Sequence, residues 1–251
     1  MLIYIYDNTF EGLLTAVYNG FYSKNPPEFI YGEFESNIPF LLGEIVEVIT
    51  DEIKFNKVKN AIINKIDFLS LKKIYMTYLS NYENKSTLIF NYLKIAFKLK
   101  HNVHSFLNID VIRLVDNINK KVMFECHNFE GFIRFNYLDE KFLYASIEPD
   151  NDILELIGEH FKKRFPKEYF IIHDISREKA LIYDTLSYEI VTMDSDVYEK
   201  LKLHKDEYTE LWKTYFKATT IEERKNLRLQ RRMMPKRYWK HILETDTIID
   251  K

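Results

Sequence analysis

The pattern of apolar and polar positions opens with a short strand and an amphipathic helix. Residues 2–6 are rich in β-forming side chains and end at Asp7-Asn8-Thr9, which is typical of a strand followed by a turn. Asn8 is the expected helix cap, with Glu11 three residues later as its partner in a capping box. Asn25-Pro26-Pro27 is expected to end the helix. Its apolar face consists of Phe10, Leu13, Leu14, Val17, Tyr18 and Phe21.

A longer helical region follows. Residues 45–49 fit either a strand or the start of a helix, and the pattern leaves both open. From residue 51 to about 119 the apolar spacing predicts three or four helices. The expected breaks lie near residues 67–70, 82–86 and 102–110. The expected helix caps are Ser70, Ser86 and Asp110.

The pattern changes at Gly131 from helical to β-rich. A helix opened by Pro149-Asp150 and stopped by Pro166 separates two predicted strand pairs. The predicted strands are 132–137, 142–147, 169–174, 180–184 and a short one at 188–192. From 196 to about 241 the chain is expected to be mostly helical. The order predicts an α+β fold with a central β-β-α-β-β unit and a helical C-terminus. We expect one domain, 1–251, which can be subdivided into a mainly helical part, 1–130, and the remainder, 131–251.

Two polar residues interrupt the apolar arc of the helix before Pro166. His160 and Arg164 fall in the middle of an arc that includes Ile157 and Phe161. A buried, unpaired charge costs several kcal/mol, so Arg164 needs a partner or a wet pocket. Alternatively, both residues favour the helix dipole near its C-terminus, and the arginine reaches out to solvent. Spacing alone does not separate these alternatives.

A second polar group follows the predicted strands. Arg134 lies among apolar residues, His173 and Asp174 end a strand, and Arg177 follows in the turn. If the strand end lies beside the helix end, these side chains and His160 converge. Arginines there would suit phosphate or carboxylate binding, and His160, His173 and Asp174 are candidates for general acid–base catalysis. Ordinary turn chemistry with a surface salt bridge is the competing interpretation.

The charge of the whole chain, −2, gives no indication of nucleic-acid binding, but its distribution does. From Arg224 to Lys240 there are eight Lys or Arg in 17 positions and no acid. A predicted basic stripe, with Lys225 beside it, consists of Arg224, Arg228, Arg231 and Arg232. Phosphates attract such a stripe, and bases stack on aromatic rings interleaved with cations. The candidate residues for this second role are Arg237, Tyr238, Trp239 and Lys240. A solvated helix face whose aromatic rings pack on the core remains the alternative.

Several classes of protein are excluded or disfavoured. A single cysteine, Cys126, permits no internal disulfide and no cysteine-rich zinc or iron–sulfur site. Cys126 and His127 could form a catalytic dyad, but adjacent residues on a helix point about 100° apart and no third member is evident, so Cys126 is expected to be a small buried hydrophobe. No Gly-rich phosphate loop or metal-ligand spacing is present, and we expect neither metal nor cofactor. Without a membrane span or signal peptide in the sequence, we expect a cytoplasmic protein without membrane contact.

The motifs resemble a bacterial family described as DNA metabolism or repair proteins. The matching stretches follow the expected order along the chain. They are Tyr6 to Val17, Gly131 to Phe135, His160-Phe161-x-x-Arg164-Phe165, Ile172-His173-Asp174 with Arg177, and Arg232 to His241. This chain differs from the family pattern at one position: Cys126 stands where a glutamate before a histidine is expected. That difference weakens any catalytic role there.

The resemblance implies a setting in DNA repair or modification. Proteins of that family are associated with a radical-SAM partner resembling spore photoproduct lyase, and a related domain occurs fused to uracil-DNA glycosylase-like domains. This chain lacks a Cys-x-x-x-Cys-x-x-Cys triplet, so it is not itself the radical-SAM enzyme. Three hypotheses follow: a DNA-binding accessory protein, an enzyme acting on nucleic acid through its own Arg, His and Asp side chains, or a protein-interaction subunit without DNA contact.

Overall fold

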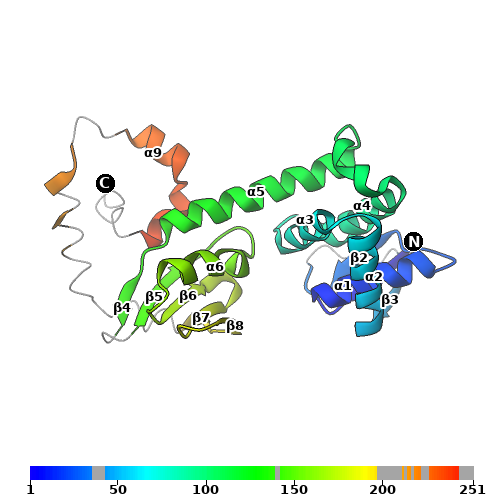
Figure 1. The fold of residues 1–251 in the computed structure, drawn as a ribbon, viewed down its shortest axis with the longest axis horizontal. Coiled ribbons are helices and arrows are strands. Elements are labelled where there is room, and N and C mark those ends of the chain that lie inside the picture. The colour runs from blue at the N-terminus through cyan, green and yellow to red at the C-terminus, as the bar shows by residue number, and fades with distance from the viewer. Residues whose placement is uncertain are drawn as a thin grey trace. The chain divides into compact units, whose positions relative to one another are not determined.

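The computed structural model describes residues 1–35, 43–138, 142–196, 211, 214–215, 218–221 and 226–242. The chain divides into two compact units, Met1–Val122 and Met123–Lys251, called unit 1 and unit 2 below (Figure 1). Both contain helices and strands, which confirms the predicted α+β class.

Unit 1 is built on a small parallel sheet covered by helices. Its strands are β1 (Leu2–Tyr6), β2 (Phe29–Gly32) and β3 (Glu44–Val48), in the order β2-β1-β3. Parallel neighbours need a crossover connection, and α1 (Phe10–Tyr22) supplies it between β1 and β2. The other helices are α2 (Glu52–Lys65), α3 (Phe68–Leu79), α4 (Lys85–Leu99) and the 3₁₀ helix η1 (Lys100–Ser105). Helix α1 packs on α2, and α4 packs on β2.

The core of unit 1 joins these layers. Ile3 on β1 and Tyr31 on β2 belong to one buried cluster and are almost completely buried. Helix α1 buries Leu13, Leu14 and Val17, which belong to the apolar face predicted from the sequence. Helix α5 (Asp110–Phe132) then begins in unit 1 and ends in unit 2.

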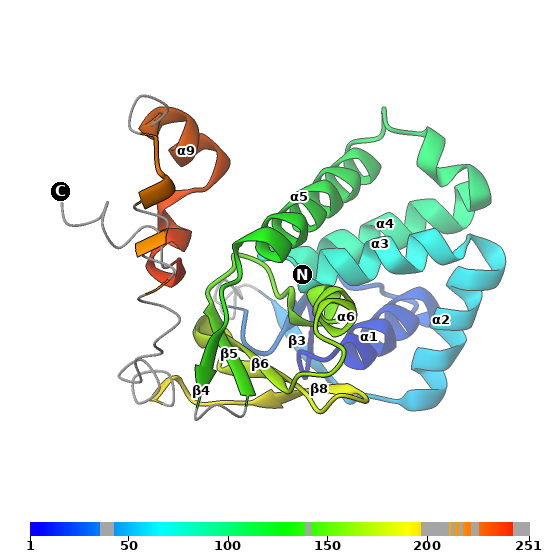
Figure 2. The ribbon, with the colours of Figure 1, turned by 60° about the vertical axis from the view of Figure 1, so that its left-hand side comes forward.

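Unit 2 is a five-stranded sheet with one helix packed on it. The strand order is β4 (Asn136–Leu138), β5 (Phe142–Ile147), β6 (Phe170–Asp174), β7 (Lys179–Tyr183) and β8 (Tyr188–Thr192). All neighbours are antiparallel except β5 and β6, which are parallel and are connected through α6 (Leu154–Arg164). Helix α6 packs on β7 and β8. Figure 2 shows α6 viewed almost along its axis, next to β8. The unit also contains the short 3₁₀ helix η2 (Ile175–Arg177), α9 (Leu227–Met233) and the 3₁₀ helix η4 (Lys236–His241).

Most predicted elements are confirmed, with corrections at their ends. The open question over residues 45–49 is resolved as strand β3. The first helix is capped by Thr9, whose side chain accepts a hydrogen bond from the Gly12 amide, and not by Asn8, which has a positive φ of 61°. That helix ends at Tyr22, earlier than the prolines suggested.

Two further boundaries were predicted wrongly. Helix α5 continues through Gly131, so the strand expected from residue 132 begins only at Asn136. The helix expected from Pro149 begins at Leu154, because residues 149–152 form a loop held by side chains from elsewhere in unit 2.

The expected caps of the middle helices also need correction. Asp67 rather than Ser70 caps α3 by accepting from the Ser70 amide at 2.6 Å. Ser86 lies inside α4, where its hydroxyl is 2.8 Å from the Tyr6 hydroxyl. Helix α5 begins at Asp110, so Asp110 is its first residue and not its cap; the carbonyl of Ile109, the residue before it, accepts from the Arg113 amide at 3.0 Å. Of the region expected to be helical after residue 196, α9 and η4 are helical, and much of the rest lies outside the described residues.

Candidate nucleic-acid interface

The basic tract is partly exposed and partly used to hold the fold. Arg228, Arg231 and Arg232 lie on α9 and are exposed to solvent. The Asn226 side chain caps this helix by accepting from the Leu229 amide at 3.0 Å. Arg224 and Lys225 fall outside the described residues, as does the side chain of Lys240 in η4.

The aromatic residues of the tract are buried. Tyr238 and Trp239 are 5% and 3% exposed. The Tyr238 ring meets Phe129 of α5 edge to face, with centroids 4.9 Å apart, and the Trp239 indole N–H donates to the Met234 carbonyl at 2.9 Å. Their expected role as stacking platforms for bases is therefore wrong, because burying their large apolar area anchors the segment to unit 2.

Glu125 of α5 is the centre of the contacts that anchor this segment. Its side chain is 6% exposed, and its carboxylate accepts from the Asp150 amide at 2.8 Å and the Asn151 amide at 2.9 Å. It also accepts from the Asn151 side-chain amide at 2.6 Å and the Tyr238 hydroxyl at 2.7 Å. Four donors offset the cost of burying a carboxylate. Burial raises the pKa of Tyr238, which keeps the hydroxyl protonated as the donor.

Arg237 and His241 fix the segment on either side of the buried rings. The Arg237 guanidinium pairs with the Asp150 carboxylate, lies 2.9 Å from the Tyr238 oxygen and is centred 4.8 Å from that ring. The His241 ring nitrogens lie 2.9 Å from the Ser146 hydroxyl and 2.9 Å from the Glu148 carboxylate. We call residues 234–242 the docking segment. It connects α9 to the rest of unit 2 through several independent contacts.

Asp174 and Arg177 hold the same loop from the other side. The Arg177 guanidinium donates to the Asp174 carboxylate at 2.8 Å and to the Pro149 carbonyl at 3.0 Å, and it also bonds the Asp150 carbonyl. Burial raises the pKa of the fully buried Asp174, and the nearby Arg177 opposes that rise. The structure therefore brings these two predicted residues together, as a clamp on residues 149–152.

His173 is held in a closed arrangement on β6. The Tyr144 hydroxyl lies 2.8 Å from its Nδ1, and its Nε2 lies 3.1 Å from the Met193 carbonyl oxygen. Since a carbonyl only accepts, Nε2 carries the proton and Nδ1 accepts from tyrosine. Burial lowers the pKa of His173, so the neutral form is favoured. Both nitrogens are engaged and the ring is fully buried, which does not favour a catalytic acid or base.

The remaining candidates lie near the end of α5 and on α6. His160 is partly exposed, with Nδ1 3.8 Å from the Glu130 carboxylate. Arg164 is exposed, with its guanidinium carbon 5.6 Å from the Phe165 ring centroid, so it reaches solvent at the end of the helix. Arg134 donates to the Gly131 carbonyl at 2.7 Å. The described contacts connect Asp174 with Arg177, whereas the other four candidates each contact different partners. The four are Arg134, His160, Arg164 and His173.

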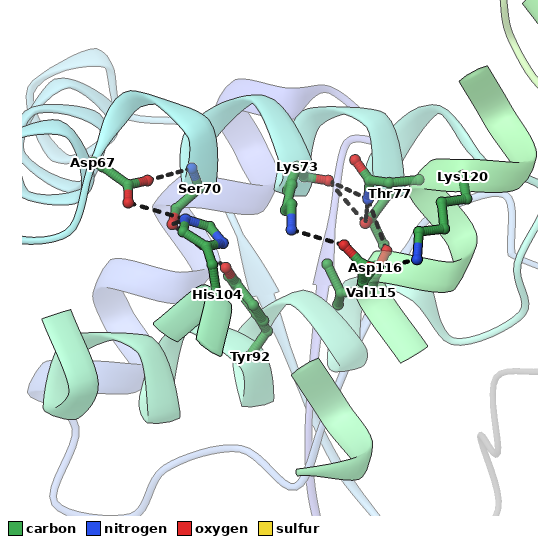
Figure 3. A network of polar contacts seen from close by, with 10 residues as sticks. Asp67, Ser70, Lys73, Thr77, Tyr92, His104, Val115, Asp116 and Lys120 are labelled. Carbon is green, nitrogen blue, oxygen red and sulfur yellow. Dashed lines mark hydrogen bonds and ion pairs between the residues drawn. The ribbon is translucent and has the colours of Figure 1, made fainter. Parts of the chain in front are cut away.

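Unit 1 contains a polar network that the sequence did not indicate (Figure 3). His104 Nε2 lies 2.9 Å from the Asp67 carboxylate and 3.4 Å from the Ser70 hydroxyl. Because Asp67 and Ser70 share one ring nitrogen and Ser70 is fully buried, the three residues do not form a nucleophilic triad. Further along α3, Lys73 lies 2.8 Å from Asp116 of α5, which also pairs with Lys120. The network connects α3 to its neighbours.

Neither a metal-binding cluster nor a membrane-spanning helix is present among the described residues. Within them, no group of three or more His, Cys, Asp or Glu side chains is placed to hold a metal ion. No described helix has the length and apolar character needed to cross a bilayer.

Comparison with known proteins identifies a family. The model of a family described as a domain of unknown function, DUF4130, matches residues 83–244. No curated protein matches the chain. No solved structure matches it either.

Proposed function

The chain belongs to the DUF4130 family of domains of unknown function, and we propose that it is a DNA-binding protein that contacts the phosphate backbone through α9. The observation that supports this proposal is the exposure of Arg228, Arg231 and Arg232 on a helix attached to the docking segment. On a helical wheel these three side chains span roughly 100°. They therefore form one basic face.

The charge around that face favours an anionic partner. The sequence has no acidic residue between Arg224 and Lys240, and Lys236 is exposed next to the buried rings. Neutralising phosphates with such cations releases counterions, which gives binding that is strong at low salt and weak at high salt. Arg177 and Arg237 have other roles, because their guanidinium groups bond to protein atoms of the loop at residues 149–152.

The setting that we propose is DNA repair or modification. It is supported by the resemblance of motifs such as Arg232 to His241 to a family of DNA metabolism or repair proteins. In this setting the chain is an accessory protein to a radical-SAM enzyme resembling spore photoproduct lyase. The partner supplies the radical chemistry, and this chain supplies the contact with DNA.

A second observation favours a protein partner as well. Leu229 and Met233 are 53% and 65% exposed, and they lie on the side of α9 away from the arginine face. Exposed apolar side chains opposite a basic face are suited to a helix that contacts two molecules. The protein-interaction hypothesis is therefore compatible with DNA binding.

Fluorescence anisotropy with a labelled DNA duplex at graded salt concentrations tests the proposal. The double variant Arg231→Glu/Arg232→Glu should bind more weakly and reduce the slope of log affinity against log salt by about 2. Arg231→Lys/Arg232→Lys should keep most of the affinity. The matched control, Lys72→Glu/Lys121→Glu, changes the net charge equally at two exposed helix positions.

Two results would overturn the proposal. One is no DNA affinity at low salt. The other is an equal loss of DNA affinity in Arg231→Glu/Arg232→Glu and in the control Lys72→Glu/Lys121→Glu, since that loss would reflect net charge alone. The partner role is tested separately by co-purification with a radical-SAM protein. Leu229→Ser/Met233→Ser should abolish co-purification and leave the salt dependence of DNA binding unchanged, whereas undiminished co-purification would remove the helix from the interface.

A further inference from the structure

Unit 1 has a groove whose lining residues are not part of its polar network. It lies among α1, α2, the end of α4 and η1, and its volume is about 950 Å³. The side chains that matter here are Tyr18, Tyr22, Phe97, Lys57, Lys65 and Lys100. We call it the aromatic groove. Its volume is at the upper end of the range typical of ligand sites.

Aromatic rings form one part of the groove. Tyr22 is 76% exposed at the end of α1, and its ring centroid lies 4.5 Å from that of Tyr18 one turn earlier. Phe21, 39% exposed, meets Phe97 of α4 edge to face at 5.6 Å. A tyrosine left this exposed beside other rings contributes little to the core and presents a flat apolar surface to a ligand.

Cations form the other part. Lys57 and Lys65 come from α2 and Lys100 from η1, and His101 lies beside them. The Lys57 ammonium lies 5.7 Å from the Tyr18 ring centroid, so positive charge and ring face are neighbours. Within the described part of the chain, no carboxylate lines the groove. Such a lining favours a ligand that is both aromatic and negatively charged.

We propose that the aromatic groove binds an unpaired stretch of DNA, with a base stacked on Tyr22 and phosphates near Lys57, Lys65 and Lys100. Stacking platforms combined with cations along the backbone are the usual means of holding single strands without sequence preference. A duplex is a poor ligand for this groove, because its base faces are already stacked on each other. The inference rests on the proposed function in taking DNA as the ligand, but it uses residues in the other unit.

The first experiment compares a labelled oligodeoxythymidine strand, the same strand in a duplex, and free thymidine monophosphate, each with the full chain. We expect the strand to bind more tightly than the duplex or the mononucleotide. Tyr22→Leu should weaken strand binding roughly ten-fold, while Tyr22→Phe should retain it. Phe68→Leu is the matched control, since Phe68 is 67% exposed on α3 and is not among the residues lining the groove.

The lysines are tested in the same assay. Lys57→Glu/Lys65→Glu should lower the affinity for the strand and the slope of log affinity against log salt. Lys57→Arg/Lys65→Arg, which keeps both charges, should retain the affinity and slope of the parent chain. The pair Lys72→Glu/Lys121→Glu again controls for net charge. A strand carrying 5-iodouracil should form a photochemical crosslink to the peptide that contains Tyr18 and Tyr22.

The outcomes separate this inference from the α9 proposal. If groove variants bind the strand like the parent chain, or if the crosslink maps elsewhere, the groove proposal is overturned while α9 is unaffected. Tight binding of the mononucleotide with no gain for the strand would replace the strand with a nucleotide ligand and overturn the proposal. Loss of strand preference in groove variants, with duplex binding through α9 retained, supports it. Loss of strand binding in groove variants with no effect of the α9 arginines supports the groove and overturns the α9 proposal.

Discussion

The hydroxyl of Tyr238 donates a 2.7 Å hydrogen bond to the buried carboxylate of Glu125, which lies 113 positions earlier in the chain. Around this bond, the loop at residues 149–152 receives contacts from α5, from Arg177 and from Arg237. The basic helix α9 precedes the docking segment directly. How firmly α9 is held therefore depends on a carboxylate far away in sequence.

Removing one side of this bond should destabilise unit 2. Tyr238→Phe keeps the ring against Phe129 but loses one donor, and we expect about 1–2 kcal/mol less free energy of unfolding. Glu125→Gln should cost more, about 2–4 kcal/mol, because an amide nitrogen cannot accept from Asp150 or Asn151. Urea unfolding followed by tryptophan fluorescence measures this, since both tryptophans lie between Met123 and Lys251. Equal stability of all three chains would contradict a structural role for Glu125.

The stability of unit 2 should fall in mildly acidic solution because of His173. Burial holds the pKa of His173 below its usual value of 6.5. Between the two values the unfolded chain binds a proton that the folded chain does not, so stability is complete above about pH 6.5 and decreases as the pH falls. The slope from this group is at most about 1.4 kcal/mol per pH unit.

The variant His173→Gln provides the comparison for that slope. It removes the titrating ring and should flatten the dependence of unfolding free energy on pH between 7 and 5. Asp174, whose pKa burial raises, contributes in the opposite direction, but it is present in both chains. Parallel curves for parent and variant would show that His173 is not the source.

Cys126 should be inert in the folded protein. Burial, with a smaller contribution from Glu125, raises the pKa of its thiol to about 12. At pH 8 the thiolate fraction is then of order 10⁻⁴, and the thiolate is the reactive form. Labelling with a chromogenic disulfide should be very slow in buffer and complete within minutes in urea. Fast labelling of the native chain would contradict both its burial and its interpretation as a small core residue.

Asp67 should stabilise unit 1 through two contacts at once. Burial acts to raise its pKa, but its hydrogen bonds with Ser70 and His104 outweigh that effect and lower it. Asp67→Ala should cost about 1–3 kcal/mol through loss of the α3 cap and the His104 contact. Asp67→Asn should cost less because it still caps. Hydrogen exchange of α3 peptides measures the effect, with Asp110→Ala as control, because Asp110 pairs with Arg113 on the surface. Equal exchange in Asp67→Ala and Asp110→Ala would contradict the prediction.

The sequence predicted elements whose signals are local. The strands at 142–147 and 188–192 were found because β-branched and aromatic residues are bounded by turns. The end of α5 was missed because Gly131 was interpreted as a break. In the structure a side chain at Gly131 would meet no atom within 4 Å, so an exposed glycine near the end of a long helix is simply tolerated.

The candidate site depended on information that the sequence hides. The sequence did not show whether Arg164 lines a pocket or reaches out to solvent from the end of its helix. In the structure its side chain is exposed, as the second interpretation predicted. Glu125 gave no signal, because its donors come from Asp150, Asn151 and Tyr238, far along the chain. The basic tract was recognisable from composition, but the burial of Tyr238 and Trp239 within it depended on the tertiary contacts of α5.

The long separation between Glu125 and Tyr238 also sets an order of events during synthesis. Glu125 and the loop at residues 149–152 emerge from the ribosome well before the docking segment, and closing so long a loop is slow. A nascent chain can thus form the sheet of unit 2 while α9 is still unattached. The basic helix would reach its place only after that sheet had formed, so a partly made chain would have its scaffold before the helix that we propose as its DNA contact was attached.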